Sequence, residues 1–133
     1  RGLGDVYKRQ DQNNKPTMNN IEEKLPEWSR DLNCAITVCD ADCRIIYMND
    51  LSRKTFARHG DIIGHNLLDY HPERACAIIR RLLETGGTNC YTIEKGEVRK
   101  MIYQTAWRQQ GRVAGLVEIS MVIPAEMPHY VRK

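Results

Sequence analysis

Two short runs, Ala35-Ile-Thr-Val-Cys-Asp40 and Arg44-Ile-Ile-Tyr-Met-Asn49, determine how the rest of the chain is interpreted. Both runs are rich in β-branched residues, which favour extended strands. The short polar turn Asp40-Ala41-Asp42-Cys43 joins them. Two such runs around a tight turn predict a β-hairpin.

The last third of the chain contains strand and turn patterns alone. Strands are predicted over residues 89–94, 99–108 and 113–123, and turns containing Gly96 and Gly111 join them. This order predicts an antiparallel meander.

Alternation in the last of these runs predicts a sheet with one buried face and one wetter face. The apolar members of the alternation are Val113, Val117, Ile119 and Met121. Glu118 and Ser120 take the opposite parity and are expected on the wetter face.

Helices are predicted over residues 25–32, 51–58 and 72–84. Pro26 and Pro72 suit a first helical position, where the missing N–H costs nothing. The element order predicts an α+β fold: a five-stranded antiparallel sheet, with helices inserted between strands 2 and 3 that cover one face.

The composition is that of one folded domain. The chain has 133 residues, of which 41% are hydrophobic and 28% charged, far from the signature of disorder. The formal net charge is +3. Three basic residues against one acidic residue in the opening RGLGDVYKRQ supply most of that charge. No basic stripe is visible, so no nucleic-acid partner is expected.

The chain is divided into four segments. Residues 5–10, DVYKRQ, are what a transposon-end sequencing adapter would encode, so residues 1–10 are interpreted as a scar and 1–17 as a non-native or disordered leader. Residues 18–33 are expected to form an N-terminal helical cap, 34–123 the domain and 124–133 a tail.

The sequence predicts a cytoplasmic protein that does not enter a membrane. No run of eighteen apolar residues and no signal peptide are present. The five cysteines are odd in number and form no C-x-x-C pair, so reduced thiols are expected. Three of them cluster at Cys34, Cys39 and Cys43, but a hairpin would splay them, and no metal site is predicted.

Residues 34–123 resemble the PAS domain family in four segments. The opening hairpin is similar to the family's, with Asp40 and Asn49 at its strand ends. Residues 63–68, IGHNLL, are similar to the Gly-x-x-Leu step between helices, and residues 111–120 to the final strand. The loop DYHPER at 69–74 resembles PAS domains found beside hemerythrin-like domains, with Tyr70 in place of a cysteine. One departure is Cys43, where the family has glycine in the first turn.

The resemblance implies a non-enzymatic sensory module that binds a small ligand or a separate signalling protein and acts by dimerisation or docking. Leu67 occupies the position of the flavin-reactive cysteine, which argues against light sensing. No cofactor is predicted. Two alternatives remain: a haem or thiol redox sensor that uses His71 or the cysteines, and a small enzyme on a similar α+β fold.

Two sets of candidate site residues follow. The ligand-pocket candidates are Tyr47, Phe56, Leu67, His71, Tyr91, Tyr103 and Trp107. The candidates for a homodimer interface on the N-terminal helix are Leu25, Trp28 and Leu32.

Overall fold

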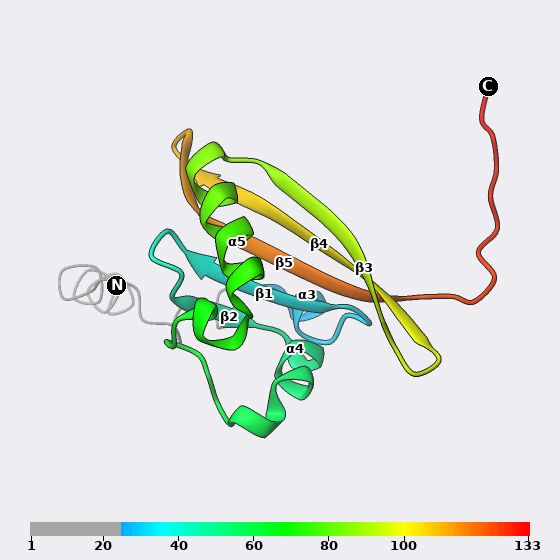
Figure 1. Cartoon of the computed structure of the whole chain (residues 1–133), viewed down its shortest axis with the longest axis horizontal. Helices are drawn as coiled ribbons and strands as arrows, with labels where there is room; N and C mark the ends of the chain where they lie inside the picture. Colours follow the sequence, from blue (N-terminus) through cyan, green and yellow to red (C-terminus); the bar gives the residue numbers. More distant parts are fainter. Residues whose placement is uncertain (1–24) are drawn as a thin grey trace, which may run out of the picture.

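The computed structural model describes residues 25–133 and contains one five-stranded antiparallel sheet (Figure 1). The predicted leader and the first part of the predicted cap lie outside the described residues. The strands are β1 (Ala35–Asp40), β2 (Ile45–Met48), β3 (Thr88–Lys95), β4 (Val98–Gln109) and β5 (Arg112–Ile123). Their order across the sheet is β2-β1-β5-β4-β3. The predicted α+β fold is confirmed.

Helices follow β2 and lie in front of one face of the sheet in Figure 1. They are α4 (Asp50–Thr55), the 3₁₀ helices η1 (Ala57–His59) and η2 (Leu67–Tyr70), and α5 (Glu73–Thr85). The predicted helix over residues 51–58 is therefore divided into α4 and η1. Among residues 25–133, no helix is long and apolar enough to cross a membrane.

The long helix α5 packs along one side onto the sheet. Cys76, Ile79 and Leu82 are buried, and their spacing places them on one face of the helix. Pro72 has an extended backbone and is the N-cap residue, so it precedes the helix rather than occupying its first position. Gly86 ends the helix in the left-handed conformation, and its N–H donates to the Leu82 carbonyl at 2.8 Å.

The N-terminal helix is shorter than predicted. α3 (Glu27–Arg30) is a single turn: Pro26 is extended and serves as the N-cap residue, and the backbone leaves the helical conformation at Asp31. Its buried residue is Ser29, whose hydroxyl lies 3.4 Å from the Tyr47 hydroxyl of β2. Trp28, on the same turn, is 65% exposed.

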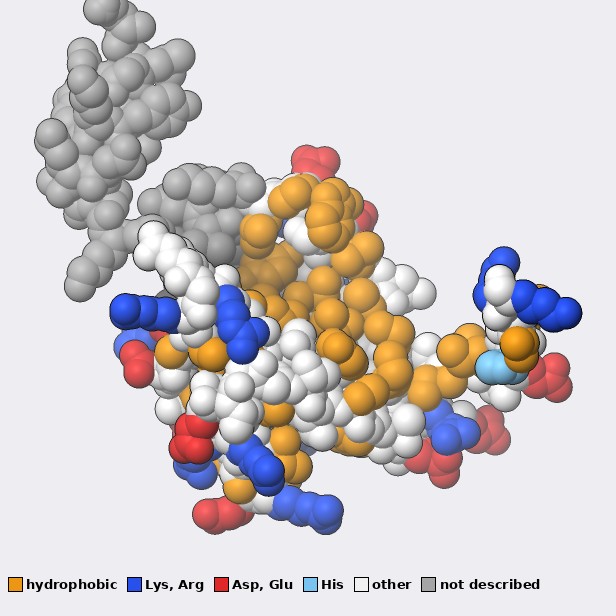
Figure 2. Space-filling view, turned by 90° about the horizontal axis from the view of Figure 1, so that it is seen from above, with side chains coloured by type: hydrophobic (Ala, Val, Ile, Leu, Met, Phe, Trp, Pro, Cys, Tyr) orange, Lys and Arg blue, Asp and Glu red, His pale blue; other side chains and the backbone are white. Residues whose placement is uncertain are grey.

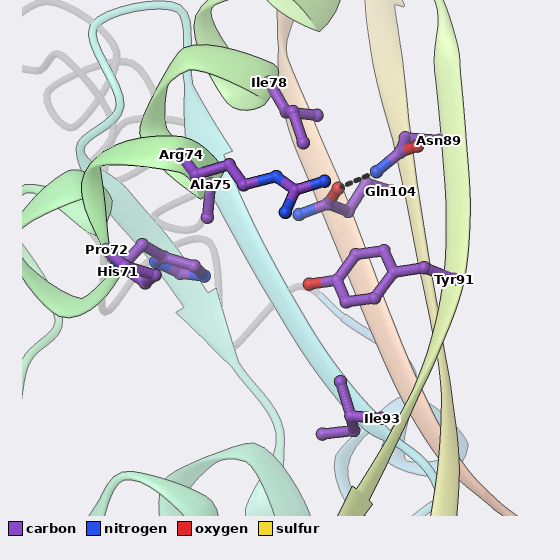
Figure 3. Close-up of a pocket in the computed structure, with 9 residues that line it drawn as sticks. All are labelled: His71, Pro72, Arg74, Ala75, Ile78, Asn89, Tyr91, Ile93 and Gln104. Atoms are coloured by element: carbon purple, nitrogen blue, oxygen red, sulfur yellow. Dashed lines mark hydrogen bonds between the residues drawn. The ribbon is translucent and has the colours of Figure 1, made fainter.

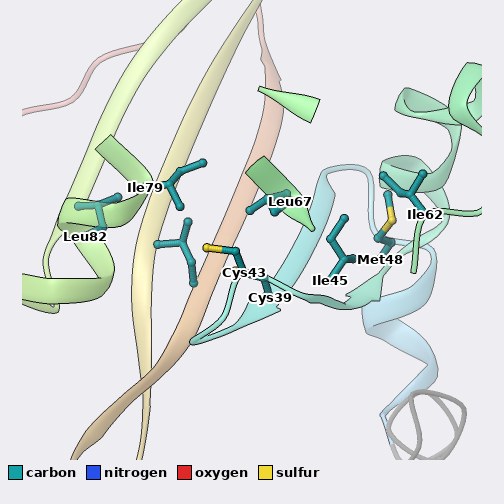
Figure 4. Packing of buried hydrophobic residues seen from close by; sticks show 9 residues of the cluster. Cys39, Cys43, Ile45, Met48, Ile62, Leu67, Ile79 and Leu82 are labelled. Atoms are coloured by element: carbon teal, nitrogen blue, oxygen red, sulfur yellow. The ribbon is translucent and has the colours of Figure 1, made fainter. Parts of the chain in front are cut away.

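A buried apolar cluster holds the helices against the β1 half of the sheet (Figure 4). Its members come from β1, β2, β5, α5, η2 and the connecting loops: Cys39, Cys43, Ile45, Met48, Ile62, Leu67, Ile79, Leu82 and Leu116. Because none of these residues belongs to β3 or β4, the other half of the helix-covered face is packed differently.

Cys43 occupies the first turn with a φ of 65°, in the left-handed region that glycine adopts without strain. A non-glycine residue there costs on the order of 1 kcal/mol. The thiol is 5% exposed and belongs to the apolar cluster, so burial of the side chain offsets that cost.

Asn49 joins β1, β2 and α4 through one fully buried amide. Its Oδ1 accepts from the backbone N–H groups of Ile36 at 2.9 Å and Ser52 at 3.1 Å, which caps α4. Its Nδ2 donates to the Cys34 carbonyl at 2.8 Å. The asparagine that ends the predicted hairpin therefore ties the start of the sheet to the first helix.

We expect Asn49→Ala to lower the free energy of unfolding by about 3 kcal/mol, because it leaves buried backbone groups unpaired as well as removing a cap. Asn66→Ala is the matched control, since Asn66 caps η2 through Leu68 N–H but is exposed. It should cost about 1 kcal/mol or less. Urea denaturation of both variants measures the difference, and equal losses would contradict the role given to Asn49.

Candidate functional site

The strand register brings three polar side chains together on the helix-covered face of the sheet. Asn89 of β3 lies opposite Gln104 of β4, and Gln104 lies opposite Glu118 of β5. Asn89 Nδ2 donates to Gln104 Oε1 at 3.0 Å, and Gln104 Nε2 donates to Glu118 Oε2 at 2.8 Å. The three residues form a hydrogen-bonded row across β3, β4 and β5.

His71, immediately before α5, closes this row from the helical side. Its Nε2 lies 3.5 Å from Glu118 Oε2, and both side chains are only 11% exposed. Its Nδ1 lies 2.9 Å from the Leu67 carbonyl oxygen. A carbonyl only accepts, so Nδ1 carries a proton, and an ionised Glu118 is satisfied when Nε2 carries one as well. The geometry therefore favours a charged imidazolium beside a charged carboxylate.

The electrostatics of the pair agree with this arrangement. Burial alone would lower the pKa of His71, but Glu118 and the Leu67 carbonyl outweigh it and raise that pKa above its ordinary value. Burial alone would raise the pKa of Glu118, but His71 and the Gln104 amide outweigh it and hold that pKa below its ordinary value. Each charge stabilises the other in a site largely removed from water.

A cavity of about 560 Å³ lies beside this pair, between α5 and strands β3 and β4 (Figure 3). Its lining residues are His71, Pro72, Arg74, Ala75, Ile78, Asn89, Tyr91, Ile93 and Gln104. A smaller cavity of about 180 Å³ shares His71, Tyr91 and Ile93 with it and reaches Phe56 and Lys100. Apolar side chains with a few polar groups are the usual lining of a small-molecule site.

The polar groups of the larger cavity come from opposite walls. Figure 3 shows the Arg74 guanidinium extending from α5 toward Gln104, and the Tyr91 hydroxyl extending from β3 into the same space. Burial raises the pKa of the Tyr91 phenol, with a smaller contribution from Glu118, so Tyr91 enters the cavity as a neutral hydroxyl.

The structure brings three of the seven pocket candidates together. His71 and Tyr91 line both cavities, and Phe56 lines the smaller one. Leu67 is buried in the apolar cluster instead.

Tyr103 and Trp107 do not line either cavity, because they have the opposite parity to Gln104 and lie on the other face of the sheet. The Trp107 indole donates to the Cys39 carbonyl at 3.0 Å. Tyr47 lies opposite Val38 in the hairpin and is covered by α3.

The residues that the sequence left unassigned are Asn89, Gln104, Glu118 and Arg74. The predicted alternation in β5 is correct, but the prediction that Glu118 lies on the wetter face of the sheet is wrong. Glu118 faces the helices, whereas Val117 and Ile119 lie half-buried on the outer face. The sequence does contain a signal for this site, because each of the strands β3, β4 and β5 carries a polar residue on the same face. The strand register is needed to show that these residues are neighbours.

His71 does not suit iron. Both of its ring nitrogens already face acceptors, so neither offers a free lone pair to a metal while the Glu118 pair is intact. Among residues 25–133, no group of three or more His, Cys, Asp or Glu side chains could hold a metal ion.

The cysteines do not form a reactive thiol site in the core. All five are unpaired. Burial raises the pKa of Cys39 to about 12, and burial together with Asp40 raises the pKa of Cys43. Both thiols stay protonated near neutral pH, which is unfavourable for a redox sensor that requires a thiolate.

The chain matches the family model described as the PAS fold over residues 29–126, more than half of its length. It therefore belongs to the PAS family. PAS domains are generally sensory modules of signalling proteins.

Solved structures share the fold at low sequence identity. The PAS domain of histidine kinase ThkA has a TM-score of 0.57 at 18% identity, over 68% of this chain and 99% of that one. The PAS domain of a protein from Colwellia psychrerythraea has a TM-score of 0.58 at 16% identity, over 77% and 97%. The Aer2 receptor from Vibrio cholerae, described as a dual PAS-haem oxygen sensor, has a TM-score of 0.52 at 16% identity, over 68% and 95%. No curated protein matches the chain significantly.

We expect Glu118→Gln to move the His71 pKa from above its ordinary 6.5 to below it, because burial then acts without the opposing carboxylate. NMR titration of the His71 ring measures this change. Glu94→Gln, which removes an exposed carboxylate from β3, is the control and should leave the His71 pKa where it is.

The same pair predicts a pH dependence of stability. The raised His71 pKa stabilises the fold fully below 6.5, and this contribution is lost as the pH rises through the folded value. The lowered Glu118 pKa stabilises it above 4.5, and this contribution is lost as the pH falls through the folded value. The stability difference between wild type and Glu118→Gln should therefore be largest between these two values. A difference that grows toward alkaline pH would contradict the assignment of charges.

Proposed function

We propose that this chain is the ligand-sensing module of a signalling protein, and that it holds a small molecule in the cavity between α5 and strands β3 and β4. The cavity itself carries the proposal. Its volume of about 560 Å³ lies within the range of small-molecule sites. Its walls combine apolar side chains with an arginine, a phenol and two amides.

The position of the cavity supports a sensing role. The buried apolar cluster contains no residue of β3 or β4, and the side chains of β3 are exposed or half-buried, so this half of the helix-covered face has room for an occupant. A molecule bound there contacts α5 on one side and β3 and β4 on the other, and its presence changes how the helix and the sheet are held together.

We further propose a non-catalytic module that acts in the cytosol. His71 is already paired through both nitrogens, and the Cys76 thiol donates to the Leu68 carbonyl at 3.2 Å rather than facing a base. The five unpaired cysteines are those expected of a protein kept in a reducing compartment.

We expect Ala75→Trp to abolish ligand binding, because Ala75 lines the cavity from α5 and an indole would fill it. Compounds from a small-molecule library that stabilise the wild type should raise its Tm by about 5 °C at ten times Kd. The same compounds should have no effect on Ala75→Trp. Ala77→Trp, on the exposed side of the same helix, should respond like the wild type.

Equal stabilisation of Ala75→Trp by the same compounds would place the ligand elsewhere and overturn the proposal. A library in which no compound shifts the wild-type Tm would count against ligand sensing altogether.

We also propose that the module forms a homodimer through its N-terminal turn. Trp28 is 65% exposed and Leu25 is 36% exposed, while Leu32 is half-buried. The domain thus uses Ser29 rather than Trp28 to seat α3 against Tyr47. Hydrophobic side chains also gather over a broad part of the surface (Figure 2). A two-fold contact is the commonest way in which soluble domains cover such residues.

We expect Trp28→Ala to shift a dimer toward monomer while the monomer stays folded, because burial of the indole contributes on the order of 2 kcal/mol per subunit. Light scattering at matched concentration measures the mass. Tyr130→Ala, which removes an aromatic ring of the tail that is 74% exposed, is the control and should leave the mass unchanged. A wild-type monomer at high micromolar concentration would contradict the dimer.

A further inference from the structure

The larger cavity contains a cation that no described side chain neutralises. Arg74 lies in the first turn of α5, and its guanidinium extends into the cavity toward Gln104 and the Tyr91 hydroxyl (Figure 3). Within the described part of the chain, residues 25–133, it forms no ion pair. An unpaired guanidinium directed into an apolar cavity is a binding group for an anion.

The other charges around the two cavities do not cancel that of Arg74. The carboxylate of Glu118 is already matched by His71 at 3.5 Å. Lys100 lines the smaller, adjoining cavity and, within residues 25–133, also forms no ion pair. The combined site therefore has an excess of positive charge, which disfavours a cationic ligand and favours an anionic one.

The remaining walls limit the kind of anion. Pro72, Ala75, Ile78 and Ile93 supply apolar surface. The Tyr91 hydroxyl and the second hydrogen of the Asn89 amide are further donors on the walls of the same cavity. One fork-shaped cation beside neutral donors matches a single planar carboxylate, and the second cation, Lys100, lines the adjoining cavity rather than this one. The apolar walls require that the carboxylate be carried on a hydrophobic body.

We infer that the cavity binds a small organic carboxylate with an apolar body, and that Arg74 determines the preference for the acid. This inference rests on the proposed function, because it names the chemical class of the ligand for the same cavity. In this arrangement the carboxylate lies against the Arg74 guanidinium and the Tyr91 hydroxyl, and the hydrophobic body lies against Ile78 and Ile93.

The test compares two probes of nearly the same size and shape, charged 1-naphthaleneacetate and its neutral amide, by titration calorimetry. The wild type should bind the carboxylate about tenfold or more tightly than the amide, the effect of one charge-assisted contact. Arg74→Gln keeps a polar side chain with an N–H donor, but it shortens the side chain and removes its charge. It should bind the two probes with equal affinity. Arg80→Gln, an exposed change on another side of α5, should preserve the wild-type preference.

The outcomes separate this inference from the proposed function. Equal binding of both probes by the wild type, abolished in Ala75→Trp, would leave the cavity as a ligand site and overturn the role of Arg74. A carboxylate preference that persists in Arg74→Gln would also overturn it. Binding of neither probe at millimolar concentration would contradict both proposals.

Discussion

The buried charge of Glu118 constrains the whole helix-covered face. A carboxylate removed from water is strongly unfavourable unless an opposite charge and hydrogen-bond donors surround it. His71 supplies the charge and Gln104 the donor, so the start of α5 and the middle of β4 are held at fixed distances from β5. Gln104 in turn accepts from Asn89, which extends the same constraint to β3. The positions of His71, Gln104 and Asn89 on the cavity wall thus follow from the contacts that stabilise the Glu118 carboxylate.

The space between the helices and the sheet contains two regions of different character. On the β1 side lies the dry cluster that contains Ile45, Leu67 and Ile79, packed as a protein core. On the β3 side, α5 stands away from the sheet and the cavity opens between them. The first region buries apolar side chains and thereby stabilises the domain. The second leaves apolar side chains such as Ile93 available for a ligand.

Local patterns in the sequence were sufficient for the fold, because each strand and the long helix have turn or cap residues at their ends. They were less informative about the site. Parity within one strand shows which residues share a face, but not which face the helices cover, and Glu118 was therefore assigned to the wetter side. The same limitation explains Tyr103 and Trp107, whose aromatic character suited a pocket but whose parity places them on the outer face. Arg74 appeared as an ordinary charged residue at a helix start until the structure placed the cavity beside it.

The neighbouring positions of β1 and β5 have a consequence for how the domain is assembled. These strands lie near opposite ends of the folded region, yet Ala35 pairs with Ser120 and Asp40 with Gly115 at the middle of the sheet. The hairpin that is synthesised first therefore has no central partner until the last strand has been synthesised. Contacts between residues so distant in sequence slow folding, because a long loop must close before they form. During synthesis on the ribosome, the domain must remain incomplete until β5 has emerged.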